Sequence, residues 1–351
     1  MRERQQAVTI LWALRSPCNL QCQYCYFGTQ EIPAPTHVGA LSHQGHRDVT
    51  LAALLAFLRT CSSTLVRRVF LAGGEPLVWL GTRRIITTLK AVGCEVIVCT
   101  NGLPLQRDDL CRFLLEQEVD AVSISLDSAD PVTNDHWRKD RSGQGWQGVV
   151  AGIQNLIRLR DAEQAPMRIG VYSVLTQHTL PQLMQTGDFV AGLGTDYFIP
   201  QPVSLAGDHP LYAELCIDHR HSQVFADQLG SLKLAHPDLY VGHPAYLARV
   251  LRTLQPGSLP MIQGCFGGRD LFFIEPDGSV WDCPSAAKIQ QTPPDQRRSI
   301  LYASAEEVFS ARWRCRNTDC SLFSQDCVNM WQLMAFDDIL QSEGRLYAQL
   351  L

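Results

Sequence analysis

Six short apolar runs in residues 1–205 constrain the fold of this chain more than any other feature. They alternate with segments whose apolar residues are spaced for one face of a helix. The expected strands are residues 8–14, 67–73, 94–102, 119–127, 168–176 and 195–203, and the expected helices are 49–60, 80–92, 107–117, 145–160 and 180–193. Near-continuous Val, Ile, Leu and Phe runs between helices are typical of a parallel sheet covered on both faces. Six such units are fewer than an eight-fold barrel needs, so a partial barrel and an open doubly wound sheet both remain possible.

The loops after the first four expected strands have unusual compositions. One carries cysteines (18–25), and the others read GGEP (73–76), TNG (100–102) and SLDS (125–128). Parallel α/β sheets bind their ligands at the C-terminal ends of the strands. We therefore expect the functional site at this end of the sheet.

The alternation stops near residue 205. Turn dipeptides with Pro and Gly then surround two expected helices. Further on, two apolar runs around a Pro-Asp-Gly turn predict a hairpin over 271–283, an exposed loop follows at 290–299, and a helix is expected near 328–341. The expected division is a sheet-forming part (1–205), a helical connecting region (206–262) and a small C-terminal unit (263–351).

The composition argues against several classes of protein. Hydrophobic residues make up 46% of the 351 and charged residues 19%, which is an ordinary globular mix. The 30 basic and 35 acidic residues give a net charge of −5, so no nucleic-acid partner is indicated. No apolar run approaches the ~20 residues of a membrane span, and no signal-peptide cleavage site follows the N-terminal run. We therefore expect a cytoplasmic protein, whose thiols stay reduced.

Thirteen cysteines are many for such a compartment, and eight of them form two groups. Clustered cysteines in a reduced protein indicate metal or cluster ligands, or redox catalysts, before they indicate disulfides. The first group is Cys18, Cys22 and Cys25, and the second is Cys265, Cys283, Cys315, Cys320 and Cys327.

The first group offers three thiols where a structural zinc site wants four ligands. A cubane iron–sulfur cluster has four irons, each of which wants one outer ligand, usually a thiolate. Three thiolates on one short loop would leave one iron open to a small chelating molecule. A zinc site completed by a ligand from elsewhere in the chain is the alternative.

The segment CNLQCQYC (18–25) fits the CxxxCx(aromatic)C signature of the radical S-adenosylmethionine (SAM) superfamily, and residues 1–205 resemble its partial (βα)6 TIM-like barrel. The GGEP, TNG and SLD loops follow successive strands as in that family, and HWRK (136–139) resembles its arginine-bearing segment. The resemblance implies that the three thiols hold a [4Fe-4S] cluster whose fourth iron is chelated by SAM. An electron from a flavodoxin- or ferredoxin-type reductant would then cleave SAM to methionine and a 5′-deoxyadenosyl radical, which abstracts a substrate hydrogen.

The same resemblance implies contacts to SAM. Taken alone, GGEP could equally be a turn that ends a strand, and a lone serine or arginine could be structural. By the resemblance, the GGE residues lie along the methionyl amino group, the serine contacts the ribose or carboxylate, the arginine contacts the carboxylate, and the tyrosine backs the adenine. These residues are Gly73, Gly74, Glu75 (accepting from the ammonium), Ser125, Arg138 and Tyr24, with Asn101 and Val174 as weaker contacts.

The second cysteine group resembles the SPASM or twitch extension of the superfamily, which holds auxiliary iron–sulfur clusters. Cys265 and Cys283 flank the expected hairpin, and three further cysteines follow. No cysteine follows Cys327, unlike the full SPASM pattern, so one auxiliary [4Fe-4S] cluster is expected and one of the five cysteines is spare. A zinc-stapled C-terminal lobe is the alternative.

Relatives with auxiliary clusters either mature ribosomal peptides or tailor sugars, aminocyclitols and nucleosides. Only 17 residues precede Cys18, which leaves no room for an N-terminal peptide-recognition domain. We therefore expect a small natural-product substrate that is dehydrogenated, epimerised or decarboxylated, with peptide maturation as the second choice. Cys216 in the connecting region is a candidate hydrogen donor, as in epimerases. A non-enzymatic iron–sulfur or zinc-stabilised protein is a third class, disfavoured by the open three-cysteine site.

Overall fold

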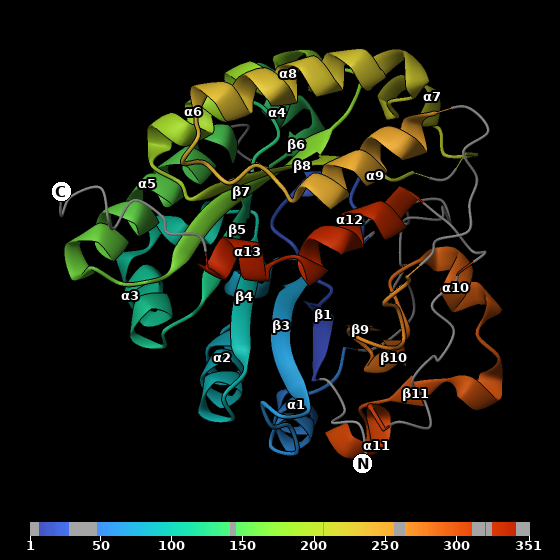
Figure 1. Ribbon diagram of the computed structural model, residues 1–351. Coiled ribbons are helices and arrows are strands. Elements are labelled where there is room, and N and C mark those ends of the chain that lie inside the picture. The colour runs from blue at the N-terminus through green and yellow to red at the C-terminus, as the bar shows by residue number, and fades with distance from the viewer. Residues whose placement is uncertain are drawn as a thin grey trace.

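The computed structural model describes residues 7–27, 48–140, 145–205, 207–255, 264–310, 320 and 325–341. Within this part of the chain the core is one nine-stranded sheet in the order β11-β10-β9-β1-β3-β4-β5-β7-β8 (Figure 1). The strands are β1 (Val8–Arg15), β3 (Val66–Gly73), β4 (Glu95–Thr100), β5 (Ala121–Ser125), β7 (Arg168–Leu175), β8 (Tyr197–Pro202), β9 (Leu271–Ile274), β10 (Ser279–Trp281) and β11 (Arg298–Ser299).

The six strands from β1 to β8 are the six that the sequence predicts, and they pair in parallel. They are almost wholly buried, as expected for strands covered on both faces. They also follow one another in chain order across the sheet, whereas a doubly wound sheet reverses its order at a switch point. The strand order therefore selects the partial barrel over the open sheet.

Helices cover the outside of this barrel at the predicted positions. The expected helices are α1 (Leu51–Leu58), α2 (Gly81–Ala91), α3 (Asp108–Glu116), α5 (Gly145–Glu163) and α6 (Leu183–Leu193). Helix α2 shows why they form: Ile85, Ile86 and Leu89 lie on one face at helical spacing and are fully buried. Of the described helices, none is long and apolar enough to cross a membrane.

Short elements between the strands were not predicted. Helix α4 (Pro131–Trp137) lies where the sequence indicated a loop, with Asp130 as its N-cap. Two strands, β2 (Gln21–Cys22) and β6 (Arg138–Lys139), pair as an antiparallel ribbon apart from the main sheet. One-turn 3₁₀ helices η1 (Pro76–Val78), η2 (Leu103–Gln106) and η3 (Leu180–Gln182) follow β3, β4 and β7. These elements are too short to leave a periodic pattern in the sequence.

The predicted hairpin is present, and it joins the barrel. Strand β9 pairs in parallel with β1, from Thr9 opposite Leu271 to Trp12 opposite Ile274. Strand β10 then pairs antiparallel to β9, and β11 to β10, so part of the predicted 290–299 loop is a strand. The C-terminal unit, with α10 (Ala286–Gln291), η5 (Pro294–Gln296) and α11 (Ala305–Val308), therefore extends the barrel sheet.

The last helices lie against the barrel strands. The single helix expected near 328–341 is two, α12 (Gln325–Met334) and α13 (Asp337–Gln341), which cross in front of the sheet in Figure 1. Between them, Phe336 packs its ring 5.0 Å from Phe70 and 5.8 Å from Tyr197. The buried Arg68 of β3 donates to Asp337 at 2.6 Å. The connecting region supplies α7 (Tyr212–Leu215), η4 (His219–His221), α8 (Ser222–Ala235) and α9 (Pro244–Leu254).

Candidate functional site

A cavity of about 270 Å³ opens at the C-terminal ends of the parallel strands, where the sequence predicts the site. It is lined by residues of all six strands, by residues of the loops that follow some of them, and by Asn329, Met330 and Leu333 of α12. The predicted site residues that it brings together are Cys18, Cys22, Cys25, Tyr24, Gly73, Gly74, Asn101, Ser125, Arg138 and Val174. Glu75 and Cys216 do not line it.

The β2–β6 ribbon joins the cysteine loop to the arginine-bearing segment. Cys22 pairs directly with Arg138, and the backbone N–H of Gln23 donates to the Trp137 carbonyl at 3.0 Å. On the other side of the loop, Asn101 Nδ2 donates to Asn19 Oδ1 at 2.6 Å. The ribbon therefore explains why residues more than a hundred positions apart share one wall of the cavity.

The two glycines of GGEP allow the end of β3 to touch the start of the cysteine loop. Gly73 has a φ of +122°, and a Cβ there would lie 2.6 Å from the Arg15 carbonyl oxygen. A Cβ at Gly74 would lie 2.1 Å from the Pro17 oxygen. The backbone N–H groups of Gly74 and Glu75 donate to Arg15 and Pro17 at 2.7 and 2.9 Å. Only glycine suits such an approach, and the contact fixes the base of the loop.

Glu75 lies behind the cavity wall and not at its surface. Its fully buried carboxylate accepts from the Leu77 N–H (2.9 Å), the Thr100 hydroxyl (2.8 Å) and the Asn101 N–H (2.6 Å). Burial raises the pKa of Glu75 to about 7, although these hydrogen bonds oppose the shift. The side chain thus holds the end of β4 and places Asn101, and the ammonium contact expected of it is not what the geometry shows.

Asp127 connects the predicted residues, and the sequence reasoning passed over it. Its carboxylate accepts from the Tyr24 hydroxyl, from Arg138 Nη1 at 3.3 Å and from the Val174 N–H at 2.8 Å. It is 1% exposed. The signal that could have found it was the SLD motif itself, in which Ser125 was chosen and the aspartate was not.

The thiols and the guanidinium at this site suit a metal cluster and a carboxylate. Burial raises the pKa of Cys18 to about 11 and that of Cys22 to about 12, so both thiols hold their protons at neutral pH and would release them on binding metal. Burial lowers the pKa of Arg138, but Cys22, Asp127 and Tyr24 raise it more. Arg138 Nε is buried and has no hydrogen-bond partner among the described residues. Three thiols and an unsatisfied guanidinium N–H fit a thiolate-ligated cluster and a carboxylate.

Four cysteines of the second group meet at another, smaller cavity. Cys265, Cys283, Cys320 and Cys327 line it with Phe266, Met330 and Trp331, among others. Cys315 lies outside the described residues. Met330 borders both cavities. Within the described part of the chain no three His, Cys, Asp or Glu side chains are placed to hold a single metal ion. Four converging thiols fit the outer ligands of one closed cubane cluster.

Cys216 is not at the cavity surface. It is 6% exposed and belongs to a small apolar cluster with Tyr24, Trp137, Val203 and Leu215. Burial raises the pKa of its thiol to about 11. By contrast Cys99 of β4, which belongs to neither cysteine group, lines the cavity. Cys216 therefore lies behind residues that line the cavity, such as Tyr24 and Val203.

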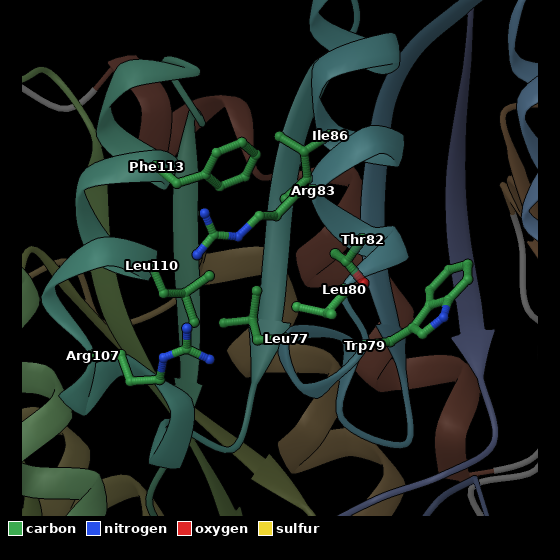
Figure 2. Close-up of a pocket in the computed structure, with 9 residues that line it drawn as sticks. All are labelled: Leu77, Trp79, Leu80, Thr82, Arg83, Ile86, Arg107, Leu110 and Phe113. Atoms are coloured by element: carbon green, nitrogen blue, oxygen red, sulfur yellow. The ribbon is translucent and has the colours of Figure 1, made fainter.

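A further pocket, between α2 and α3, contains none of the predicted site residues. Figure 2 shows its lining, in which Leu77, Leu110 and Phe113 surround the arginines Arg83 and Arg107. Both arginines bind Asp109, at 2.6 and 2.9 Å. The Arg83 contact connects α2 to α3 on the outside of the barrel, whereas Arg107 is the N-cap residue of α3 itself.

Comparison with known proteins agrees with this geometry. Residues 17–176 match the family model described as "Radical SAM superfamily". The chain is 31% identical over 149 residues to "Molybdenum cofactor biosynthesis protein 1" of Drosophila melanogaster (42% of this chain, 24% of the relative). It is 30% identical over 201 residues to "Probable GTP 3',8-cyclase" of Methanopyrus kandleri (56% of this chain, 58% of the relative). The matches thus span a quarter to three fifths of these curated relatives.

Two solved structures share the fold over most of the chain. Streptococcus suis SuiB bound to S-adenosylmethionine superposes with a TM-score of 0.63 at 13% identity, over 88% of this chain and 66% of that one. Native anSMEcpe with bound AdoMet and Cp18Cys peptide superposes with a TM-score of 0.60 at 17% identity, over 87% and 81%. At such identities the likeness concerns the fold alone.

The family match covers the first cysteine loop, the GGEP segment and Arg138. The cofactors of a domain of this kind are a [4Fe-4S] cluster and SAM, and the residues that line the larger cavity fit both. The partial barrel of this chain, over residues 17–176, is a domain of the Radical SAM superfamily.

Proposed function

We propose that the protein is a radical SAM enzyme with one auxiliary [4Fe-4S] cluster. The observation that carries the proposal is that Cys18, Cys22 and Cys25 line one cavity together with Arg138, whose buried Nε has no hydrogen-bond partner among the described residues. When bound and reduced, the cluster and SAM would supply a 5′-deoxyadenosyl radical that abstracts hydrogen from the substrate. A flavodoxin- or ferredoxin-type protein is the proposed reductant.

The residues around the cavity would hold SAM in place. Arg138 would bind its carboxylate, since one guanidinium N–H is unsatisfied while another donates to Asp127. Asp127 also fixes the hydroxyl of Tyr24, whose ring lines the cavity and would back the adenine. Ser125 and Asn101 are the remaining polar contacts that we propose.

We propose that Cys265, Cys283, Cys320 and Cys327 ligate the auxiliary cluster, which leaves Cys315 as the spare cysteine. The convergence of four thiols on one cavity supports this ligand set. The auxiliary cluster would then belong to a C-terminal unit of residues 263–351 that follows a connecting region, 206–262. One cluster needs four outer ligands, so two auxiliary clusters would exceed the cysteines available.

The cavity favours an uncharged substrate. Among the described lining residues, Arg138 is the one with a charged side chain, and it is already paired with Asp127. The other polar lining groups are neutral, among them Ser125, Gln201 and Tyr172, whose buried hydroxyl has no partner among the described residues. A nucleoside triphosphate needs several cationic partners. We therefore propose a small natural-product substrate with hydroxyl or amide groups, such as a sugar, aminocyclitol or nucleoside, that is dehydrogenated, epimerised or decarboxylated.

Maturation of a ribosomal peptide is the second candidate. A specific observation supports it: anSMEcpe, whose fold matches 87% of this chain, is described with a bound peptide. A neutral side chain of a peptide would suit the same cavity. The two candidates differ in the size of the substrate and not in the chemistry at the cluster.

Anaerobic reconstitution with iron and sulfide, followed by SAM and dithionite, tests the shared chemistry. We expect slow formation of 5′-deoxyadenosine without any substrate, and none from Cys22→Ala. Absence of 5′-deoxyadenosine from the wild-type protein would contradict the proposal. Deuterium transfer from labelled aminocyclitols, nucleosides, peptides and GTP into 5′-deoxyadenosine then identifies the substrate, and transfer from GTP would refute the uncharged class.

A further inference from the structure

The loop of residues 18–27 contacts two different parts of the molecule, the barrel and the C-terminal unit. Its first part is attached to the barrel. Asn19 accepts from Asn101 of the β4 end, Cys22 pairs with Arg138 of β6, and the Tyr24 hydroxyl donates to Asp127 after β5. These contacts hold the segment that carries Cys18 and Cys22.

The end of the loop is attached to the C-terminal unit. The Tyr26 hydroxyl donates to the Pro284 carbonyl oxygen at 3.2 Å. The ring of Phe27 stacks on Phe273 of β9, with centroids 6.3 Å apart and planes inclined by 20°. Tyr26 and Phe27 also meet edge to face at 5.3 Å. The part of the loop that follows Cys25 therefore packs on residues of the hairpin and its flank.

These contacts connect one cysteine group to the other by a short route. Tyr26 is the neighbour of Cys25 in the chain, and Pro284 is the neighbour of Cys283. A single hydrogen bond thus separates a residue next to one thiol from a residue next to the other. Met330 of α12 gives a second connection, because it lines both cavities.

We propose that Tyr26 is a positioning residue that couples the C-terminal cysteine site to SAM binding at the first site. Metal bound by Cys265, Cys283, Cys320 and Cys327 fixes Pro284, and Pro284 fixes Tyr26 and with it the backbone of Cys25. The position of Cys25 decides where a cluster sits relative to Arg138 and the glycines. This inference rests on the proposed function, since it concerns the affinity for SAM.

The test compares Tyr26→Phe with the wild-type protein after anaerobic reconstitution. The variant keeps the ring and loses only the hydroxyl. We expect unchanged iron content, a SAM affinity about three- to tenfold weaker, as suits one lost hydrogen bond, and an altered EPR line shape of the reduced first cluster in the presence of SAM. Tyr302→Phe, at a fully exposed tyrosine, is the matched control and should bind SAM as the wild type does.

A double-mutant cycle separates coupling from a local effect. Cys283→Ser, which removes the auxiliary metal, should weaken SAM binding on its own, and Tyr26→Phe should then add no further loss. Cys320→Ser serves the same purpose if Cys283→Ser does not fold. Equal losses from Tyr26→Phe with and without the auxiliary metal, or no loss in either, would overturn the coupling. Failure of the proposed function itself would be seen in the wild type, as an EPR signal that SAM does not change.

Discussion

The two cysteine sites differ in how many thiols they hold and in what surrounds them. Three thiols at the first site line a cavity of about 270 Å³ together with Arg138, whose Nε is buried and has no partner among the described residues. Four thiols at the second line a smaller cavity with the apolar side chains of Phe266, Met330 and Trp331. A cubane with three protein ligands keeps one iron open, whereas four ligands close it. We therefore expect the first site to bind an exchangeable ligand and the second site not to do so.

The two cysteine sites also differ in how far apart their ligands lie along the chain. The first three thiols lie within eight residues of one loop, and the barrel only has to orient that loop. The second set comes from residues 265, 283, 320 and 327, which meet because β9 and β10 form a hairpin and α12 folds back over them. The second site therefore depends on tertiary structure, and its loss should affect the fold more widely.

The difference between the two sites is tested most strongly by removing a ligand from the first one, the open site of Cys18, Cys22 and Cys25. Cys22→Ala should lower the iron of the reconstituted protein from about eight to about four per chain, because one of two four-iron clusters is lost. Formation of 5′-deoxyadenosine should fall by at least about 10³-fold, since the barrier to cleavage is lowered only at that cluster. Iron and sulfide analysis with chromatography of the SAM products measures both.

Cys111→Ala is the matched control, because that thiol is fully buried and outside both cavities. It should keep both the iron and the activity. If Cys22→Ala kept all of its iron, the assignment of the first loop as a cluster site would be wrong.

The next largest loss of iron and activity should come from a substitution at the second, closed site, which four thiols line. Cys320→Ala should lose about four irons per chain, because it removes one of the four thiols that meet at the second cavity. Substrate-independent cleavage of SAM should persist at a reduced rate. Cys315→Ala is the matched variant, and we expect it to retain the iron because four other thiols complete the site. Iron loss from Cys315→Ala but not from Cys320→Ala would reverse the ligand assignment.

A charge substitution tests whether the open site is held together by Asp127. Asp127→Asn preserves the shape of the side chain but leaves the buried Arg138 without its carboxylate partner. We expect the free energy of unfolding to fall by about 2–4 kcal/mol, since a buried charge that loses its partner is costly. Urea unfolding of the reconstituted protein measures this.

Asp109→Asn, an exposed aspartate between two surface arginines, is the control. It should change the stability by less than about 1 kcal/mol. A loss from Asp127→Asn no larger than that of the control would show that Asp127 does not support the site.

The sequence predicted the parts of this molecule that depend on local pattern. Alternating apolar runs located the barrel strands, and spacing alone found Cys18, Cys22 and Cys25. The sequence-based prediction missed Asp127, because the letters SLDS do not show that Tyr24 and Arg138 converge on the aspartate. Their convergence depends on the β2–β6 ribbon, which forms only in the folded protein.

Long-range contacts account for the other differences between the sequence-based predictions and the structure. The hydrogen bond of Tyr26 could not be predicted, because its partner Pro284 lies 258 residues away. Glu75 was expected to accept from the SAM ammonium, and the sequence did not show that its carboxylate also accepts from the backbone N–H groups of Leu77 and Asn101. The pairing of β9 with β1 likewise follows only from the folded sheet.

The smallest predicted effect concerns Glu75, behind the open site, and shows as a dependence on pH. An unfolded glutamate titrates near its ordinary value of 4.5, whereas burial raises the folded pKa of Glu75 to about 7. Between these pH values the folded protein holds a proton that the unfolded chain has released, so this group makes the protein less stable as the pH rises. Between pH 5 and pH 8, the titration of Glu75 lowers the free energy of unfolding by at most about 3 kcal/mol.

Glu75→Gln should remove that slope, because the amide does not titrate over this range. The variant should be less stable at pH 5, since its amide nitrogen cannot accept from the Asn101 N–H as Oε2 does. Its stability should then change less between pH 5 and pH 8 than that of the wild type, as urea unfolding at both pH values would show. Glu116→Gln, on the exposed face of α3, should keep the wild-type slope. An unchanged slope in Glu75→Gln would mean that Glu75 is ionised throughout, and that the wall behind the open site carries a fixed negative charge.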